Sequence, residues 1–259
     1  MYVATLFGLA GRRALVTGGT SGIGVAVAEA LVSAGASVLA TSDREADCAS
    51  AADALGRKGL AVETLCLRLS GKDSAERLAR TASARLGGPV DVLVCNAGIE
   101  GPLGPTGSAQ ETDYLRVFDV NLHSAYWLAS AIAPGMREAG GGAIVLMASL
   151  SAMRGTRMIG PYAMSKAALA QAARNLAVEF GPHNIRANAV APGLIETPFS
   201  RTLMDDAAFM KRRLAATPLR RVGQPSEIAA TLPSCRAMSS DRSAALLSST
   251  SSRLWRSTA

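Results

Sequence analysis

Short apolar runs alternate with longer alanine-rich segments of helical spacing along most of the chain. The apolar runs predict strands at residues 13–18, 36–41, 61–67, 90–95, 142–149 and 185–191. Between them, apolar positions recur every three or four residues and predict helices at 23–34, 47–56, 74–86, 112–133 and 162–180. Strands that alternate with helices form a mostly parallel sheet with helices on both faces. The pattern therefore predicts a doubly wound, three-layer α/β fold, in one domain that spans residues 1–231.

Polar and glycine-rich segments follow several of these strands at their carboxyl ends. They are residues 18–24, residues 96–98, Ser149 and residues 192–193. In a parallel sheet all carboxyl ends lie along one edge, and ligands bind at that edge. We therefore expect these four segments to form one site.

The composition argues against several kinds of function. The net charge is +7, but the basic residues are scattered and have no aromatic stacking platform between them, so we expect no nucleic-acid partner. Four cysteines without paired spacing and only two histidines predict no metal site. No apolar run is long enough for a membrane span, and no secretory signal pattern is present, so a cytoplasmic location is expected.

The first strand, turn and helix have the size and pattern of a dinucleotide-binding unit. The turn reads Gly-Gly-Thr-Ser-Gly-Ile-Gly over residues 18–24. Glycines let the backbone bend tightly and approach a pyrophosphate at the N-terminus of the helix that follows. Asp43 lies near the position expected for an acid that binds the ribose. This unit makes the predicted fold Rossmann-like.

The stretch from Ser149 to Lys166 contains groups suited to proton transfer. Tyr162 and Lys166 are four residues apart, so they share one face of the predicted helix. A tyrosine loses its proton near pH 10, and a nearby ammonium favours a lower pKa because it stabilises the phenolate. Ser149 is suited to donate a hydrogen bond to a substrate oxygen.

Taken together, these motifs resemble the short-chain dehydrogenase/reductase family in its classical form, over about residues 8–231. The matching motifs are Thr-Gly-Gly-Thr-Ser-Gly-Ile-Gly at 17–24, Cys-Asn-Ala-Gly at 95–98, Asn121, Ser149, Tyr-Ala-Met-Ser-Lys at 162–166 and Ala-Pro-Gly-Leu-Ile-Glu-Thr at 191–197. The resemblance extends to 3-oxoacyl reductase-like members and to alcohol and polyol dehydrogenases. It implies an NAD(P)-dependent oxidoreductase that transfers a hydride between a nicotinamide and a secondary alcohol or ketone.

The resemblance also implies a role for each site residue. Tyr162 exchanges a proton with the substrate oxygen, Lys166 lowers the pKa of this tyrosine and binds the ribose, and Ser149 polarises the carbonyl. Asn121 helps to hold a water chain. The expected cofactor contacts are Gly18, Thr20, Ser21, Gly22, Ile23, Gly24, Ser42, Asp43, Asn96, Ala97, Gly98, Tyr162, Lys166, Pro192, Gly193, Ile195 and Thr197.

Five positions bear on how the cofactor is held. Cys95 replaces the first asparagine of the usual Asn-Asn-Ala-Gly, which is expected only to repack the site. Arg68 stands where many relatives carry an aspartate that binds adenine, and an arginine cannot accept that hydrogen bond. Ser21 is not basic and Asp43 is acidic, which favours NAD(H), whereas Arg44 could still reach the additional phosphate of NADP(H).

The substrate remains open at this stage. Residues 197–221 correspond to a helical flap with apolar residues and a basic rim, suited to an acidic tail or simply solvated. A 3-oxoacyl thioester, a polyol and a cyclic ketone are all compatible with this pattern. A homodimer or homotetramer is expected. The alternative is a nucleotide-binding protein of the same fold that is not catalytic, or only poorly active.

The composition changes abruptly after residue 231. No glycine follows Gly223, and residues 232–259 hold nine serines and four arginines. Relatives end instead in a strand close to Leu-Ala-Val-Asp-Gly-Gly, which we do not find. Possible codons for residues 254–259, read with a two-base offset, give Leu-Ala-Val-Asp-Gly. We hypothesise that this tail is translated out of the ancestral frame, and the alternative is natural divergence. Without the last strand, a weaker oligomer is expected.

Overall fold

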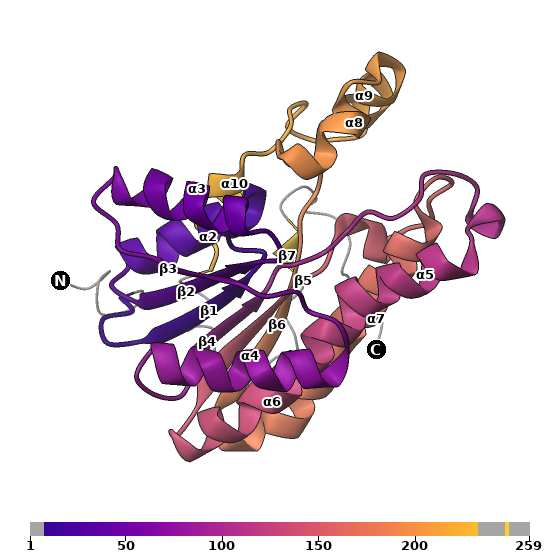
Figure 1. Cartoon of the computed structure of the whole chain (residues 1–259). Helices are drawn as coiled ribbons and strands as arrows, with labels where there is room; N and C mark the ends of the chain where they lie inside the picture. The colour runs from indigo at the N-terminus through magenta and orange to yellow at the C-terminus, as the bar shows by residue number, and fades with distance from the viewer. Residues whose placement is uncertain (1–7, 233–246, 249–259) are drawn as a thin grey trace.

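The computed structural model describes residues 8–232 and 247–248 of the chain (Figure 1). Its centre is a sheet in the order β3-β2-β1-β4-β5-β6-β7, in which every neighbouring pair is parallel. The strands are β1 (Arg13–Thr17), β2 (Ser37–Ser42), β3 (Glu63–Cys66), β4 (Val92–Cys95), β5 (Gly142–Met147), β6 (Ile185–Ala191) and β7 (Leu247–Ser248). The predicted doubly wound, Rossmann-like α/β fold is confirmed.

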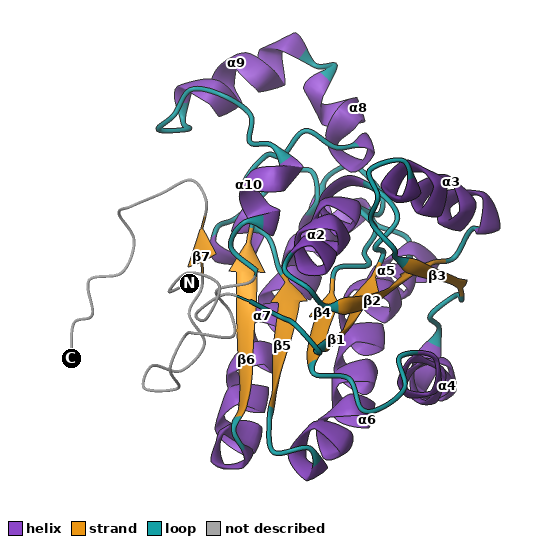
Figure 2. Cartoon of the chain, turned by 90° about the vertical axis from the view of Figure 1, so that its left-hand side faces the viewer, coloured by secondary structure: helices purple, strands orange, loops and turns teal. Residues whose placement is uncertain are grey.

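Helices cover both faces of the sheet (Figures 1 and 2). On one side lie α2 (Gly22–Ser33), α3 (Glu45–Gly56) and α10 (Pro225–Ala229), and on the other lie α4 (Gly71–Arg85), α6 (Ser124–Glu138) and α7 (Gly160–Phe180). The helix α5 (Glu111–Phe118) precedes α6. A flap follows β6 and contains α8 (Arg201–Met204) and α9 (Ala207–Ala215).

The alternation of side chains along the strands divides the core into two clusters. Leu15 and Leu93 point toward α4, α6 and α7, whereas Val16 and Val94 point toward α2 and α10. Because the central strands are buried on both faces, they are almost continuously apolar, as expected for a parallel sheet. This pattern explains why the strands were predictable from the sequence.

The region predicted as one helix over residues 112–133 is divided in the structure. A π-helical turn, Asp119–His123, separates α5 from α6. Such turns insert an extra residue into a helix and occur frequently at functional sites. The apolar spacing continues through the turn, so periodicity alone could not reveal it.

The structure corrects two details of the predicted tail. Leu232 is buried in the cluster that contains α2 and α10, so the core extends one residue beyond the predicted boundary. Leu247–Ser248 forms the short strand β7, paired with Val190 and Ala191 of β6 (Figure 2), although no last strand was expected. The remaining tail residues, 233–246 and 249–259, lie outside the described residues, and so does the rest of the frameshift hypothesis.

Candidate active site

The four segments predicted to converge lie together at the carboxyl edge of the sheet. The glycine turn follows β1, residues 96–98 follow β4, and Ser149 and residues 192–193 follow β5 and β6. Because β1, β4, β5 and β6 are neighbours and parallel, their carboxyl ends adjoin. Two hydrogen bonds connect these segments: Asn96 Nδ2 donates to the Gly18 carbonyl (2.9 Å), and the Leu150 amide donates to the Pro192 carbonyl (2.9 Å).

The glycine turn has a conformation that only glycines fit. Gly18 and Gly22 have φ angles of +58° and +51°, which side chains rarely adopt. A Cβ atom on Gly24 would overlap the Gly18 carbonyl oxygen, so α2 packs directly on the turn. Between them, Thr20, Ser21 and Ile23 lead the backbone into the first turn of α2, whose free amide groups favour a bound anion. These residues therefore fit a pyrophosphate.

The turn is supported by the loop after β4. The Thr17 hydroxyl accepts hydrogen bonds from the amides of Asn96 (3.1 Å) and Ala97 (3.2 Å). Gly98 is closely packed, since a Cβ there would lie 3.1 Å from Asn121 Oδ1 and 3.2 Å from Lys166 Nζ. The loop thus lies between the glycine turn and the groups predicted to be catalytic.

Asn121 lies in the π-helical turn and is fully buried. Its Oδ1 accepts a hydrogen bond from the Ile99 amide (2.7 Å), and its Nδ2 donates to the Ile99 carbonyl (2.9 Å) and to Ser165 Oγ (3.1 Å). Both amide protons are therefore used within the protein. The side chain of Asn121 connects the loop after β4 to α7.

Lys166 extends from α7 into the interior beneath the site. Its side chain is almost fully buried, and Nζ donates a hydrogen bond to the Met147 carbonyl at the end of β5 (2.7 Å). Burial disfavours the charged ammonium and lowers the pKa of Lys166 to about 8.

Tyr162 lies in the first turn of α7, with Lys166 Nζ 5.7 Å from the centre of its ring. Burial raises the pKa of Tyr162, while a hydrogen bond with the Ser149 side chain lowers it and the charge of Glu100 raises it further. The net direction is upward, opposite to the one expected from the spacing of Tyr162 and Lys166. The ammonium of Lys166 is hydrogen-bonded to the Met147 carbonyl. Loss of water around the phenolate therefore has the largest effect on the pKa of Tyr162.

The flap contacts this site at its base. Thr197 lies against the glycine turn, since a Cβ on Gly22 would be 3.1 Å from Thr197 Cγ2. The Phe199 ring is 5.9 Å from that of Tyr162. Ile195 is buried and pairs with Gly223 at the other end of the flap. The predicted nicotinamide end, residues 192–197, thus lies between the glycine turn and Tyr162.

The predicted adenosine end lies at the carboxyl end of β2. Ser42 is the last residue of this strand and is buried, whereas Asp43 is exposed. Arg44 Nε lies 3.8 Å from Asp47 Oδ2. Arg68 is exposed and follows Leu67, whose amide donates to the Ser42 carbonyl (2.8 Å). Arg68 thus lies close to this end of the site.

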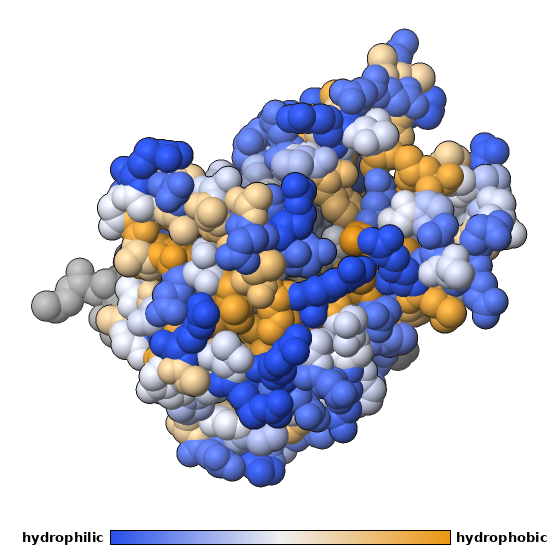
Figure 3. All heavy atoms as spheres, in the orientation of Figure 1, coloured by the Kyte–Doolittle hydropathy of each residue, from blue (hydrophilic) through white to orange (hydrophobic). Residues whose placement is uncertain are grey.

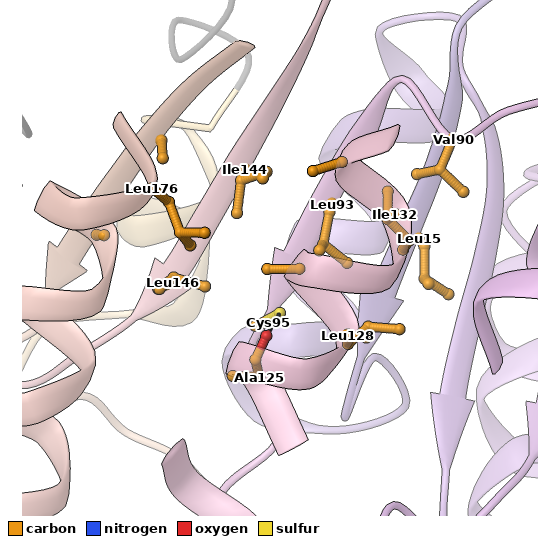
Figure 4. Close-up of a cluster of buried hydrophobic side chains, with 14 of the residues drawn as sticks. Leu15, Val90, Leu93, Cys95, Ala125, Leu128, Ile132, Ile144, Leu146 and Leu176 are labelled. Carbon is orange, nitrogen blue, oxygen red and sulfur yellow. Dashed lines mark hydrogen bonds between the residues drawn. The ribbon is translucent and has the colours of Figure 1, made fainter. Parts of the chain in front are cut away.

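Cys95 is a core residue in the structure. Its side chain packs among Leu93, Leu128 and Leu146, with Sγ 3.8 Å from the Ala125 carbonyl oxygen (Figure 4). Burial raises the pKa of its thiol to about 12, so the thiol is neutral. The replacement of the usual asparagine therefore acts on packing, as expected.

Sequence reasoning missed one acidic residue at this site. Glu100 is half-buried, and burial raises the pKa of its carboxyl group. It follows Ile99, which is held by Asn121, and its charge acts on Tyr162. The available signal was its position, two residues after the Cys-Asn-Ala-Gly motif.

Known proteins are similar to this chain over most of its length. Residues 18–248 match the family described as Enoyl-(Acyl carrier protein) reductase. Over 221 residues the chain is 36% identical to Dehydrogenase/reductase SDR family member 4 of Oryctolagus cuniculus, with 85% of each chain covered. It is 35% identical to a tropinone reductase homolog of Arabidopsis thaliana, covering 85% of this chain and 72% of that protein.

Solved structures are also similar to this chain over most of its length. A 7α-hydroxysteroid dehydrogenase complexed with NADH and 7-oxo glycochenodeoxycholic acid has a TM-score of 0.88 at 32% identity, with 96% of both chains covered. A putative NAD(P)-dependent gluconate 5-dehydrogenase from Beutenbergia cavernae, with bound NADP, has a TM-score of 0.86 at 32% identity. That match covers 94% of this chain and 96% of the other.

Proposed function

Because this chain belongs to the short-chain dehydrogenase/reductase family, we propose that Tyr162 is the acid and base of its reaction. The protein is an NAD(P)-dependent oxidoreductase that acts on alcohols and ketones. The bound dinucleotide accepts or supplies the hydride. In reduction, Tyr162 donates its phenolic proton to the oxygen of the ketone, and in oxidation its phenolate removes the hydroxyl proton.

One observation carries this assignment: Tyr162 is half-buried at the carboxyl edge of the sheet, beside Ser149, which lowers its pKa, and with Lys166 Nζ 5.7 Å from the centre of its ring. Ser149 is thereby positioned to share a substrate oxygen with Tyr162. Lys166 lies behind them, and a group with a pKa of about 8 is suited to return a proton near neutrality. Asn121 holds the loop that covers Lys166.

We place the cofactor along the carboxyl edge, with its pyrophosphate at the N-terminus of α2. Residues 18–24 bind the pyrophosphate, residues 96–98 line the floor, and residues 192–197 hold the nicotinamide end. Ser42 and Asp43 lie at the adenosine ribose. A carboxylate accepts hydrogen bonds from ribose hydroxyls and repels a phosphate, and Arg44 lies beside Asp47, so we propose a preference for NAD(H).

A panel of ketones and secondary alcohols, assayed with both nicotinamide cofactors, tests this function. We expect turnover to fall by about a thousandfold in Tyr162→Phe, since general acid–base catalysis contributes about 10²–10⁴-fold. Tyr126→Phe is the matched control, because Tyr126 lies on α6 and is 43% exposed. Unchanged turnover in Tyr162→Phe would contradict the mechanism. Cofactor binding without turnover of any compound would favour the non-catalytic alternative.

The cofactor preference has its own test. We expect a higher kcat/KM for NAD(H) than for NADP(H), and a smaller ratio in Asp43→Asn, which removes the repulsive charge. A preference for NADP(H) that Arg44→Gln abolishes would reverse the assignment.

We also propose that the chain forms a homo-oligomer. Large apolar side chains are exposed on each of three helices that are near one another: Leu115 on α5, Tyr126 on α6, and Met164 and Val178 on α7. Val178 is 73% exposed, and contiguous exposed apolar surface marks contacts between proteins. Light scattering after size exclusion tests this proposal, and a monomer at micromolar concentration would contradict it.

Among the described residues, no helix is both long and apolar enough to span a membrane.

A further inference from the structure

One large aromatic side chain lies beside the proposed acid and base without being buried. The centre of the Phe199 ring is 5.9 Å from that of Tyr162, and the two ring planes are inclined by 44°. Phe199 is nevertheless 43% exposed, although the next residue, Ser200, is buried. Single exposed apolar side chains are common on protein surfaces, so exposure alone indicates no site. The place of this ring, next to Tyr162, is what gives its exposed surface a meaning.

The backbone around Phe199 is held in place by hydrogen bonds. Phe199 belongs to a short helical turn at the base of the flap. Ser200 Oγ donates to the Ile195 carbonyl (2.6 Å), and the Thr197 amide donates to Ser200 Oγ (3.2 Å). Thr197 in turn lies against Gly22 of the glycine turn. Because these contacts fix the turn, its backbone needs little further ordering when a ligand covers the ring.

Other large apolar side chains are exposed near the start of α7, the helix that carries Tyr162. Leu103 and Met158 are 45% and 51% exposed. The Gly104 amide donates to the Met158 carbonyl (2.8 Å), so the two loops that carry these side chains lie side by side. Met158 is two residues from the start of α7. Figure 3 shows hydrophobic residues between α8 and α5 on this face of the molecule. Phe199 is therefore accompanied by further apolar surface.

The exposed surface of a phenyl ring favours apolar groups over polar ones. The ring has no atom that forms a strong hydrogen bond, so a polar group against it loses bonds to water and gains none. A hydrocarbon group in the same place removes its own apolar surface and that of the ring from water. Because Phe199 lies beside Tyr162, such a group must be attached close to the carbon that reacts.

We propose that Phe199 determines substrate specificity by packing against a hydrocarbon substituent, a ring or a branched chain, on the carbon that reacts. This proposal rests on the proposed function and narrows its substrate class to secondary alcohols and ketones with such a substituent. Small polyols, which have a hydroxyl on every carbon, are poor substrates on this view. The reaction itself is unchanged: the ketone, a proton from Tyr162 and a hydride give the secondary alcohol.

The test compares methyl ketones of nearly equal size whose substituents differ in polarity. Cyclohexyl methyl ketone is assayed with the reduced cofactor beside tetrahydropyranyl methyl ketone, in which an oxygen replaces one methylene group of the ring. In the unmodified protein we expect kcat/KM for the hydrocarbon ring to exceed that for the oxygen-containing ring by about tenfold, a difference of about 1.4 kcal/mol. Acetone, which has no such substituent, is the reference.

Three variants locate the effect. Phe199→Ala should lose this preference through a higher KM for the cyclohexyl ketone, whereas kcat/KM for acetone should change far less. A merely structural role of Phe199 would lower the turnover of both ketones alike. Phe199→Leu should keep most of the preference, because leucine restores apolar surface at the same place. Leu219→Ala is the control, since Leu219 also lies in the flap and is 63% exposed. Its preference for the hydrocarbon ring should persist.

The possible failures are distinguishable. If the two rings are reduced equally well, or if Leu219→Ala loses as much preference as Phe199→Ala, the Phe199 ring binds no substituent and the oxidoreductase function stands. If the methylpiperidinyl ketone, a cation of similar size, is preferred to both rings, the ring of Phe199 binds a cation instead and the hydrocarbon class is wrong. If no ketone, acetone included, is reduced while the cofactor binds, both the substrate class and the catalytic assignment are contradicted for methyl ketones.

Discussion

Replacing Asn121 with leucine separates the structural role of this side chain from its chemistry. Leucine has the same number and branching of side-chain heavy atoms, although it is bulkier, so it leaves no cavity, and it cannot form hydrogen bonds. The variant removes the bonds from Asn121 to the Ile99 amide (2.7 Å), to the Ile99 carbonyl (2.9 Å) and to Ser165 Oγ (3.1 Å).

The structure gives the size of the effect. A buried polar group left without a partner costs about 1–3 kcal/mol. Ser165 keeps its bond to the Tyr162 carbonyl (2.8 Å), so it loses little. Both groups of Ile99 are only partly buried, and water offsets part of their loss. We therefore expect the free energy of unfolding to fall by about 2–3 kcal/mol.

Urea unfolding followed by circular dichroism measures this loss, with the slope in denaturant unchanged. Asn175→Ala is the control, because Asn175 is exposed on α7 and its side chain accepts a hydrogen bond from the equally exposed Gln171. Its stability should change by less than about 0.5 kcal/mol. Turnover should also fall in Asn121→Leu, since Gly98 packs closely against both this side chain and Lys166 Nζ. A loss below about 1 kcal/mol would refute the view that Asn121 holds the loop.

Three further predictions concern the turn, the tyrosine and the tail. Gly24→Ala, whose Cβ meets Gly18, should weaken NADH binding by at least about tenfold in a fluorescence titration. Gly56→Ala, with open space around its Cβ, should leave NADH binding unchanged. Glu100→Gln removes a charge that raises the pKa of Tyr162, so the acidic limb of alcohol oxidation should move to lower pH; an unmoved limb would place Glu100 outside the site. The nucleotides of the gene should encode Leu-Ala-Val-Asp-Gly in the shifted frame at residues 254–259. A chain restored to that frame should melt higher and form a larger oligomer, since the described strand β7 has two residues, which pair with Val190 and Ala191.

The order of strands and helices followed from the sequence because burial imposes it. Strands covered on both faces must be almost wholly apolar, and the helices beside them must have one apolar face. The strand Ile185–Ala191 was predicted to the residue, and the glycine turn was recognisable because its backbone excludes side chains. Boundaries elsewhere differ by a few residues. The helix α4, for example, begins before its apolar pattern, where the Ser74 hydroxyl is hydrogen-bonded to the backbone of Ser70 and Gly71.

The carboxyl edge was also predictable as the place of the site, because parallel strands end together. What the sequence determined was therefore the fold, the edge and the residues that meet there. The sequence could not give the backbone conformation, the hydrogen-bond partners or the burial of those residues. The π-helical turn at Asn121, the bond from Lys166 to Met147 and the burial of Tyr162 all depend on neighbours distant in the chain.

The tertiary structure decided the electrostatics for the same reason. Spacing along α7 placed an ammonium near a phenol and predicted a lowered pKa for Tyr162. Packing instead directs that ammonium to a backbone carbonyl and leaves the phenol half-buried, and this burial raises the pKa of Tyr162. A sequence specifies which groups a site contains. Their charges depend on how far folding buries each group and on which groups it places beside it.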